Sequence, residues 1–274
     1  FSGKEKRVLS GFTIFEDHLI GLPLVGDDIL GAVFIKRTKK ENAFTGFDKE
    51  VLSVVTEQSV TAIKNLQLYE AQQKVILGSI EFIGKLIARQ DHFSRISHTP
   101  VYFRVVKALA EKLGMRGEDL DNLYYASILR DAGAIDVPYN ILAKTSQLTP
   151  EEFKEIRSQP KKSAELIQPV DFLKPVLPII LYRHEKYDGS GYPSGLKKDQ
   201  IPLGAAIMAV VDAFEAMVRD RSYRTPLTVV QAIKDLRSNA GTQFDPKVIN
   251  VFIELSKQKK FRKNLSLTRK QSNE

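Results

Sequence analysis

Four polar side chains interrupt otherwise apolar, helical stretches, and they are the residues best suited to chemistry. They are His98, Asp131, His184 and Asp212. A buried Asp is costly unless it is hydrogen-bonded, paired with a cation or bound to a metal. Imidazole and carboxylate groups gathered in one helical bundle can bind iron, zinc or manganese. The residue types leave a second interpretation open, in which each is an isolated structural residue at a helix end or in a hydrogen bond.

The absence of cysteine excludes several kinds of functional site. None of the 274 residues is Cys, which excludes disulfides, thiolate zinc sites, iron–sulfur clusters and cysteine nucleophiles. A reducing compartment is compatible with this composition, so we expect a cytoplasmic protein. No apolar run approaches the roughly 18 residues that cross a bilayer, and we expect no membrane association. The chain begins at Phe1 without an initiator Met, so we expect it to be the C-terminal part of a longer protein.

The positive charge is concentrated at the C-terminus. The chain has 41 Lys and Arg against 33 Asp and Glu, a net charge of +8, and residues 257–274 carry most of that excess. A basic run of this kind can contact nucleic acid or anionic lipid. We favour a solvated, frayed terminus, because chain ends are commonly poorly ordered. Nucleic-acid binding is therefore the weakest candidate function.

Two short apolar runs near the start of the chain predict a β-hairpin. Residues 19–25 and 30–35 have strand character, with a Gly-Asp-Asp turn at 26–28. A helical pattern then extends from Asp48 to Gln90. From residue 99 onward, closely spaced helix start and stop signals, among them Thr149-Pro150, predict an all-α domain.

The pattern over 48–90 is unusually long for a globular helix. From Leu52 to Ile87, mostly apolar residues recur at alternating steps of three and four, which is typical of a coiled-coil seam. We therefore expect one long helix that pairs two copies of the chain into a homodimer. The alternative is two helices that meet near Gly78, because glycine destabilises a helix interior by about 1 kcal/mol.

The second half of the chain contains long, specific motifs. They are Asp188-Gly189-Ser190-Gly191-Tyr192-Pro193, preceded by His184-Glu185, and then Ile201-Pro202-Leu203-Gly204-Ala205, Val211-Asp212-Ala213-Phe214 and Asp220-Arg221-Ser222-Tyr223-Arg224. Over residues 90–255 the chain strongly resembles the HD-GYP family. That family comprises metal-dependent phosphodiesterases that open cyclic di-GMP. The N-terminal piece, with Phe44-Thr-Gly-Phe-Asp48 and the helix after it, resembles the second half of a GAF sensor domain.

These resemblances imply a mainly α protein: an all-helical HD-superfamily bundle preceded by a partial α/β GAF domain and a long connecting helix. The expected divisions are a partial GAF domain at 1–70, a connecting helix at 71–90, an HD-GYP domain at 91–256 and a basic tail at 257–274. The GAF ligand pocket is expected to be incomplete.

The resemblance implies a metal cluster, usually iron, held by His and Asp, and this chain departs from it. Four expected ligands stand in the chain, His98, Asp131, His184 and Asp212. Four positions of the family's site are substituted, and they are Arg130, Ala134, Gln159 and Arg183; Ala134 stands where the family has a Lys. Arginine has no acceptor for a metal, and its charge opposes a nearby cation. We expect no cofactor, or iron or manganese if the remnant site is occupied.

We hypothesise that the guanidinium groups of Arg130 and Arg183 replace the metal electrostatically and hold Asp131 and Asp212. The alternative is that both arginines turn outward into solvent. Phosphodiester hydrolysis at such a site needs a metal-activated hydroxide and a cation for the developing phosphate charge. We therefore expect no catalytic residues and no useful hydrolytic rate.

Ligand binding does not need the complete metal site. By resemblance, Tyr192, Arg221 and Arg224 match nucleotide-contacting positions, and Arg and Tyr suit phosphate and guanine. The alternative for the two arginines is a charge interaction at a helix C-terminus. The family's Gly-Tyr-Pro loop is also associated with diguanylate cyclase partners. The corresponding docking residues are Asp188, Gly189, Gly191, Tyr192 and Pro193.

The sequence therefore predicts a dimeric signalling protein whose HD-GYP domain is catalytically inactive and binds cyclic di-GMP or docks a signalling protein. The alternative is an active metal-dependent cyclic di-GMP phosphodiesterase that uses a reduced metal site. A pure protein scaffold without nucleotide affinity is a third possibility.

Overall fold

A computed structural model describes residues 3–38, 41–90, 100–142, 144, 146–219 and 225–270. The chain divides into two compact units, Phe1–Gly78 and Ser79–Glu274. None of the helices in the described ranges is long and apolar enough to span a membrane.

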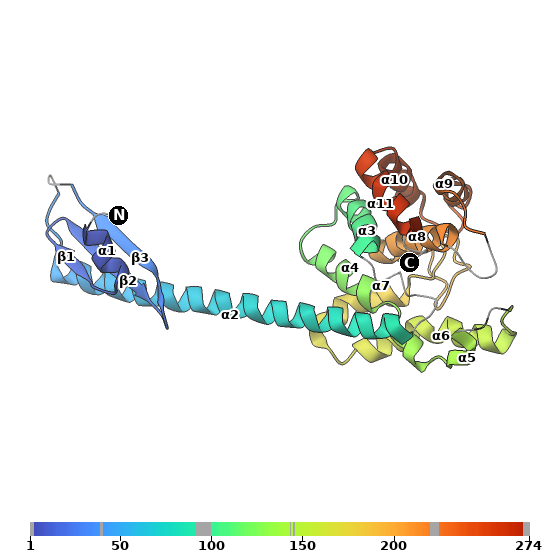
Figure 1. The fold of residues 1–274 in the computed structure, drawn as a ribbon, viewed down its shortest axis with the longest axis horizontal. Helices are drawn as coiled ribbons and strands as arrows, with labels where there is room; N and C mark the ends of the chain where they lie inside the picture. Colours follow the sequence, from blue (N-terminus) through green and yellow to red (C-terminus); the bar gives the residue numbers. More distant parts are fainter. Residues whose placement is uncertain are drawn as a thin grey trace. The chain divides into compact units, whose positions relative to one another are not determined.

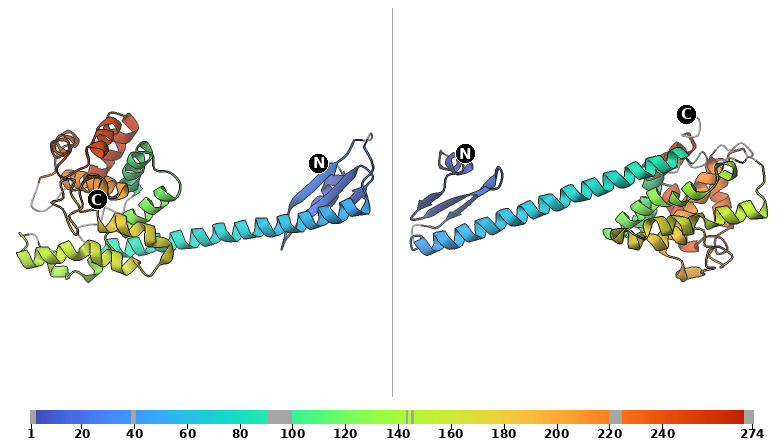
Figure 2. Two further views of the ribbon diagram at one scale, coloured as in Figure 1. Left: turned by 180° about the vertical axis from the view of Figure 1, so that it is seen from behind. Right: turned by 90° about the horizontal axis from the view of Figure 1, so that it is seen from below.

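The first unit contains a small antiparallel sheet. Helix α1 (Gly3–Leu9) precedes strands β1 (Ile14–Glu16), β2 (Leu19–Val25) and β3 (Ile29–Lys36), which lie in the order β1-β2-β3. Ile20 pairs with Ile35 across β2 and β3, so the predicted hairpin is confirmed. One face of the sheet covers the start of helix α2, as both views of Figure 2 show, and Ile20, Leu22 and Phe44 pack there with Leu52.

Helix α2 runs without interruption from Gly46 to Gln90, which confirms the single long helix and not two helices that meet at Gly78. Its start is defined by Thr45. The backbone N–H of Asp48 donates to the Thr45 hydroxyl at 3.2 Å, and the Asp48 carboxylate accepts from the Thr45 backbone N–H at 2.7 Å. This reciprocal capping satisfies donors that a helix N-terminus leaves free.

In the described part of the second unit, the regular elements are helices joined by loops (Figure 1). Its elements are α3 (Pro100–Lys112), α4 (Glu118–Leu129), η1 (Ala132–Asp136), α5 (Tyr139–Leu142), α6 (Pro150–Ile167), η2 (Asp171–Val176), α7 (Leu177–Leu181), η3 (Lys198–Gln200), α8 (Leu203–Val218), α9 (Val229–Ser238), α10 (Pro246–Ser256) and α11 (Lys259–Lys270). Thr149 caps α6 with Pro150 at its first position, as predicted.

Helix α8 is the centre of this unit, because most of its residues are apolar and buried, including Met208, Val211 and Phe214. It packs against α3, α7, α9 and α10. Asp212 lies on this helix and is partly buried, with its side chain 24% exposed.

The C-terminal segment differs from the frayed tail that we expected. Residues 259–270 form α11, which packs on α3, α8 and α10. Phe261 and Leu265 are almost completely buried, while Lys259 and Arg262 remain exposed. The prediction of a frayed tail rested on the basic composition and overlooked Phe261 and Leu265, which are four positions apart and therefore lie on one face of a helix.

Candidate functional site

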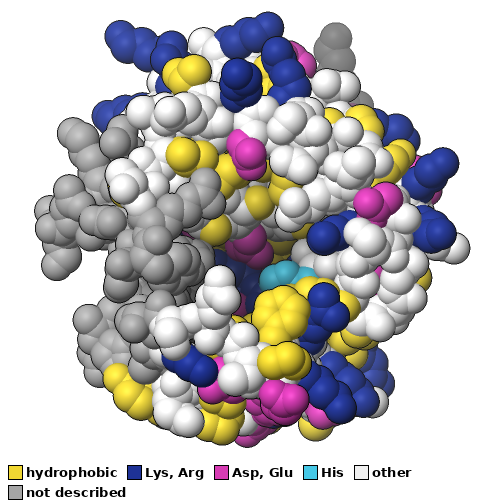
Figure 3. All heavy atoms as spheres, turned by 90° about the vertical axis from the view of Figure 1, so that its right-hand side faces the viewer, with side chains coloured by type: hydrophobic (Ala, Val, Ile, Leu, Met, Phe, Trp, Pro, Cys, Tyr) yellow, Lys and Arg dark blue, Asp and Glu magenta, His cyan; other side chains and the backbone are white. Residues whose placement is uncertain are grey.

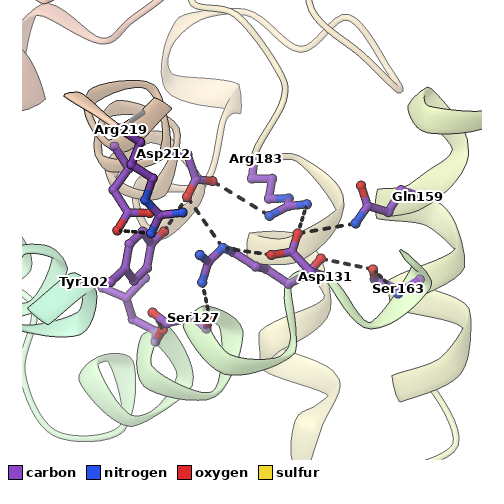
Figure 4. A network of polar contacts seen from close by, with 12 residues as sticks. Tyr102, Ser127, Asp131, Gln159, Ser163, Arg183, Asp212 and Arg219 are labelled. Atoms are coloured by element: carbon purple, nitrogen blue, oxygen red, sulfur yellow. Dashed lines mark hydrogen bonds and ion pairs between the residues drawn. The ribbon is translucent and has the colours of Figure 1, made fainter. Parts of the chain in front are cut away.

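Two arginines and two aspartates meet in the interior of the helical unit (Figure 4). Arg183 donates to Asp131 at 2.7 Å and lies 3.8 Å from Asp212. The Nε atom of Arg130 lies 3.4 Å from Asp131 and 3.5 Å from Asp212. Each arginine therefore bridges both carboxylates. The alternative that these arginines turn outward is wrong, because Arg130 is 1% exposed and Arg183 is 4% exposed.

Arg130 occupies the C-terminal cap of α4, and its side chain is fixed on several sides. Its guanidinium carbon lies 4.0 Å from the centroid of the Tyr102 ring, and a guanidinium nitrogen donates to the Ser127 carbonyl. A guanidinium stacked on an aromatic face and hydrogen-bonded at its edge retains little freedom to rotate away.

Asp131 follows directly as the N-terminal cap of η1. Besides Arg183, it accepts a long hydrogen bond from the side-chain amide of Gln159 at 3.4 Å. Ser163 ties η1 to α6, because its hydroxyl accepts from the Gly133 N–H at 2.8 Å and donates to the Arg130 carbonyl at 3.0 Å. Helix α6 thus holds the Arg130-Asp131 turn in place.

Asp212 is held from the opposite side by α3, where the Tyr102 hydroxyl donates to its carboxylate at 2.8 Å. Tyr102 and Ser163 were both missed by sequence reasoning. Tyr102 lies within an apolar helical run, and only the packing of α3 on α8 gives its hydroxyl a partner. Ser163 carried no sequence signal that distinguishes it from other serines.

The electrostatics of the four residues reinforce the pairing. Burial alone lowers the pKa of Arg130, but the neighbouring Tyr102, Asp212 and Asp131 outweigh it and raise the pKa above its usual value. Burial likewise lowers the pKa of Arg183, and Asp131 and Asp212 reverse that effect. Both guanidinium groups are therefore charged at any physiological pH.

His184, which follows Arg183, is in a different environment. Burial, together with the positive charge of Arg183, lowers its pKa to about 3. Its ring stacks on Tyr192, with centroids 5.1 Å apart and planes 16° apart. His184 is thus a neutral imidazole that is stacked on the Tyr192 ring.

The described residues do not fit the metal cluster that the HD-GYP resemblance implies. No group of three or more His, Asp or Glu in the described ranges is arranged to hold a metal ion. Asp131 and Asp212 instead have guanidinium groups against their oxygens, and a guanidinium cannot be a ligand. Of the four remnant ligands, His98 lies outside the described residues.

Of the other two substituted positions, Gln159 borders this site, and Ala134 lies three residues after Asp131 in η1. Ala134 is buried in η1 and leaves no side chain that can carry a proton or a charge. Gln159 supplies an amide donor to Asp131 where the family has a histidine. Arg221 and Arg224, the expected nucleotide contacts, lie outside the described residues.

The Gly-Tyr-Pro loop is shaped by a buried carboxylate that sequence reasoning did not single out as a site residue. Glu185 accepts from the backbone N–H groups of Ser194 at 2.6 Å and Gly195 at 3.0 Å. Gly191 lies so close to the Glu185 backbone that a Cβ would not fit. The Tyr192-Pro193 peptide bond is cis. The two hydrogen bonds to Glu185 and the close approach of Gly191 hold this loop against residue 185, and the Tyr192 ring lies beside His184.

A cavity of about 890 Å³ opens above the paired arginines and aspartates. Arg183, His184 and Tyr192 contribute to one wall, α6 contributes Gln159, and α8 contributes Asp212. Figure 3 shows a hollow on this face with basic and acidic side chains inside it and a histidine at its edge. The volume is in the range of small-molecule and cofactor sites.

The sequence of this chain matches a family model and several curated proteins. A family model described as HD domain matches residues 63–248. A cyclic di-GMP phosphodiesterase from Thermotoga maritima is 36% identical over 154 residues, which cover 55% of this chain and 41% of that protein. A cyclic di-GMP phosphodiesterase response regulator from Xanthomonas campestris pv. campestris is 35% identical over 161 residues, 58% of this chain and 41% of the regulator. The chain thus spans less than half the length of these curated relatives.

The fold is shared with a solved structure. The crystal structure of a cyclic GMP-AMP-specific phosphodiesterase from Vibrio cholerae gives a TM-score of 0.53 at 17% identity, and the match covers 71% of this chain and 53% of that one. The predicted mainly α, HD-type bundle is confirmed. The chain therefore belongs to the HD domain family, and the two curated relatives described above are named as cyclic di-GMP phosphodiesterases.

Proposed function

We propose that this chain binds a cyclic dinucleotide such as cyclic di-GMP without hydrolysing it, and acts as a signalling receptor. The observation that carries the proposal is the pairing of Arg130 and Arg183 with Asp131 and Asp212. The relatives named as cyclic di-GMP phosphodiesterases support the class of ligand. The arginine pairs support the loss of the reaction.

The positive charge of the two arginines is the physical reason why a metal ion would bind poorly at this site. A divalent ion placed between these carboxylates would lie a few ångströms from two fixed guanidinium groups. At an effective dielectric of 20, each unit charge about 4 Å away costs roughly 4 kcal/mol, and a divalent ion doubles that figure. Hydrolysis at such a site needs a metal-activated hydroxide, and no group of three or more His, Asp or Glu among the described residues is arranged to hold that metal.

The cavity remains suitable for a ligand of this class. Its volume of about 890 Å³ accommodates a dinucleotide, and the Tyr192 ring and several cations border it. The chain would then still bind the cyclic dinucleotide, although it no longer hydrolyses it. The Gly-Tyr-Pro loop beside the cavity is where we propose that a signalling partner, such as a diguanylate cyclase, would sense the bound ligand.

The test combines metal content, binding and turnover on one sample. Protein purified without chelator is analysed for iron, manganese and zinc, titrated with cyclic di-GMP by calorimetry, and incubated with the nucleotide in the presence of added Fe²⁺ or Mn²⁺. We expect substoichiometric metal, saturable binding and intact nucleotide.

A reversal variant provides the matched control. It combines Arg130→His, Ala134→Lys, Gln159→His and Arg183→His, and we expect it to retain metal, because the two opposing charges are removed. Near-stoichiometric metal in the wild type, or nucleotide opening with added metal, would overturn the proposal in favour of a phosphodiesterase with a reduced metal site. Metal-free protein without nucleotide affinity would overturn it in favour of protein docking.

A further inference from the structure

Most cations that line the cavity are already neutralised by carboxylates of the chain. The pairs are Arg130 and Arg183 with Asp131 and Asp212, and Lys144 with Glu152 at 2.6 Å. Positive charge that is balanced in this way attracts an anion weakly. The floor of the cavity, where the family's metal would lie, is therefore poorly suited to bind phosphate.

Two cations beside the Gly-Tyr-Pro loop differ from those at the floor. Lys186 lines the cavity, and Arg157 of α6 lies against the Tyr192 ring that lines it. Among the described residues, no carboxylate lies within ion-pair distance of either of these two side chains. Asp188 nevertheless lies within electrostatic range of Lys186, because hydrogen bonds from Ser190 and, to a smaller extent, the Lys186 charge lower the pKa of the Asp188 carboxyl group.

Arg157 is also held in a defined position. Its guanidinium carbon lies 4.8 Å from the centroid of the Phe153 ring, one helical turn earlier, and 5.1 Å from that of Tyr192. Tyr192 stacks in turn on His184. Aromatic contacts hold a guanidinium through its faces and leave the N–H groups at its edge available to an anion. Although Arg157 is an exposed residue, these contacts modestly favour one position of its guanidinium, and so reduce the entropy that ligand binding must remove.

We propose that Arg157, together with Lys186, binds a phosphate group of the ligand at the rim of the cavity, in place of the metal-bound phosphate position at the floor. This inference rests on the proposed function, because it takes the ligand to be a cyclic dinucleotide. The planar guanidinium of Arg157 can donate two parallel hydrogen bonds to two phosphate oxygens, and Lys186 supplies a second positive charge.

The experiment is calorimetric titration with cyclic di-GMP in the presence of EDTA. The variants are Arg157→Gln, Arg157→Lys and Lys186→Gln, with Arg104→Gln as control, because Arg104 is an exposed residue of α3 outside the cavity lining. We expect Arg157→Gln to weaken binding by about tenfold to a hundredfold, the range for hydrogen bonds to a charged group. Arg157→Lys should lose less, because it retains the charge but not the fork, and Arg104→Gln should leave the Kd unchanged.

Each outcome separates the rim site from the proposed function. If the wild type binds and Arg157→Gln binds equally well, the rim site is overturned and the receptor function stands. If the wild type does not bind cyclic di-GMP, the receptor function fails, and inorganic pyrophosphate is titrated instead. Pyrophosphate binding that is lost in Arg157→Gln supports the rim site, while binding that is unchanged or absent in both proteins overturns it.

Discussion

Arg130 and Arg183 stand where the HD-GYP resemblance implies metal ligands, and both pair with Asp131 and Asp212. Two buried or partly buried carboxylates this close to each other need positive charge between them, whether a metal or a guanidinium supplies it. Guanidinium groups supply that charge permanently, and they also donate hydrogen bonds that fix the carboxylates. The cost of burying these charges is offset by their mutual pairing, and removing one member would leave its partner buried and unpaired.

Glu215 provides a prediction at the same scale. Burial raises the pKa of this carboxyl group to about 7, against the lowering effect of Arg219 and Arg130. Because the folded pKa lies above the unfolded value of 4.5, the folded state holds the proton more tightly. The stability contributed by this group is therefore fully present below the unfolded pKa and is lost as the pH rises through 7.

We expect the unfolding free energy of the wild type to fall relative to that of Glu215→Gln by about 2 kcal/mol between about pH 5 and pH 8. Urea unfolding of both proteins across this range measures the difference. Comparison with the variant is needed because His184, whose pKa is lowered to about 3, changes stability in the opposite direction as its unfolded form titrates. Parallel curves for the two proteins would contradict the prediction.

At the scale of elements, the contact between η1 and α6 sets the position of Asp131. Gly133 allows this approach, because a Cβ there would lie 2.6 Å from the backbone nitrogen of Ser163 and closer still to the Gln159 carbonyl. Both neighbours are backbone atoms, so neither can turn away. The two elements would have to separate.

We therefore expect Gly133→Ala to destabilise the protein by about 1–3 kcal/mol, the range for an overpacked interior. Gly78→Ala is the matched control, because nothing lies within 4 Å of a Cβ at that position in α2. It should stabilise the helix by about 1 kcal/mol. Circular dichroism during thermal unfolding distinguishes the two, and equal melting temperatures for Gly133→Ala and the wild type would count against the close contact.

At the scale of the whole molecule, α2 exposes an apolar seam that a single chain leaves uncovered. Along the predicted seam, Val55 is 54% exposed, Leu66 is 61% exposed and Tyr69 is 60% exposed. The spacing of three and four is that of a coiled coil, so we propose a second copy of the same helix as the partner. This homodimer would bring two copies of each unit into one assembly.

Light scattering coupled to size-exclusion chromatography tests the dimer. We expect the wild type to elute as a dimer and the double variant Leu66→Glu, Tyr69→Glu as a monomer, because four glutamates would then face each other across the seam. Gln67→Glu, which adds charge next to the seam and not in it, should remain dimeric. A monomeric wild type would contradict the proposal.

Several features were determined by sequence alone. The hairpin of β2 and β3, the uninterrupted α2 and the start of α6 at Thr149 followed from local patterns, because strand alternation, heptad spacing and capping act between near neighbours. The family followed from long motifs around Tyr192 and Asp212. The resemblance of the first unit to a GAF domain stays a prediction.

Only the tertiary structure decided how the side chains of the substituted site are arranged. Sequence identified Arg130 and Arg183 as foreign to a metal site, but their inward direction depends on packing among α4, α7 and α8. The roles of Tyr102, Ser163 and Arg157 likewise arise from segments far apart in the chain. A guanidinium is driven inward only where carboxylates and an aromatic face replace the water it loses, and those partners exist only once the helices have packed together.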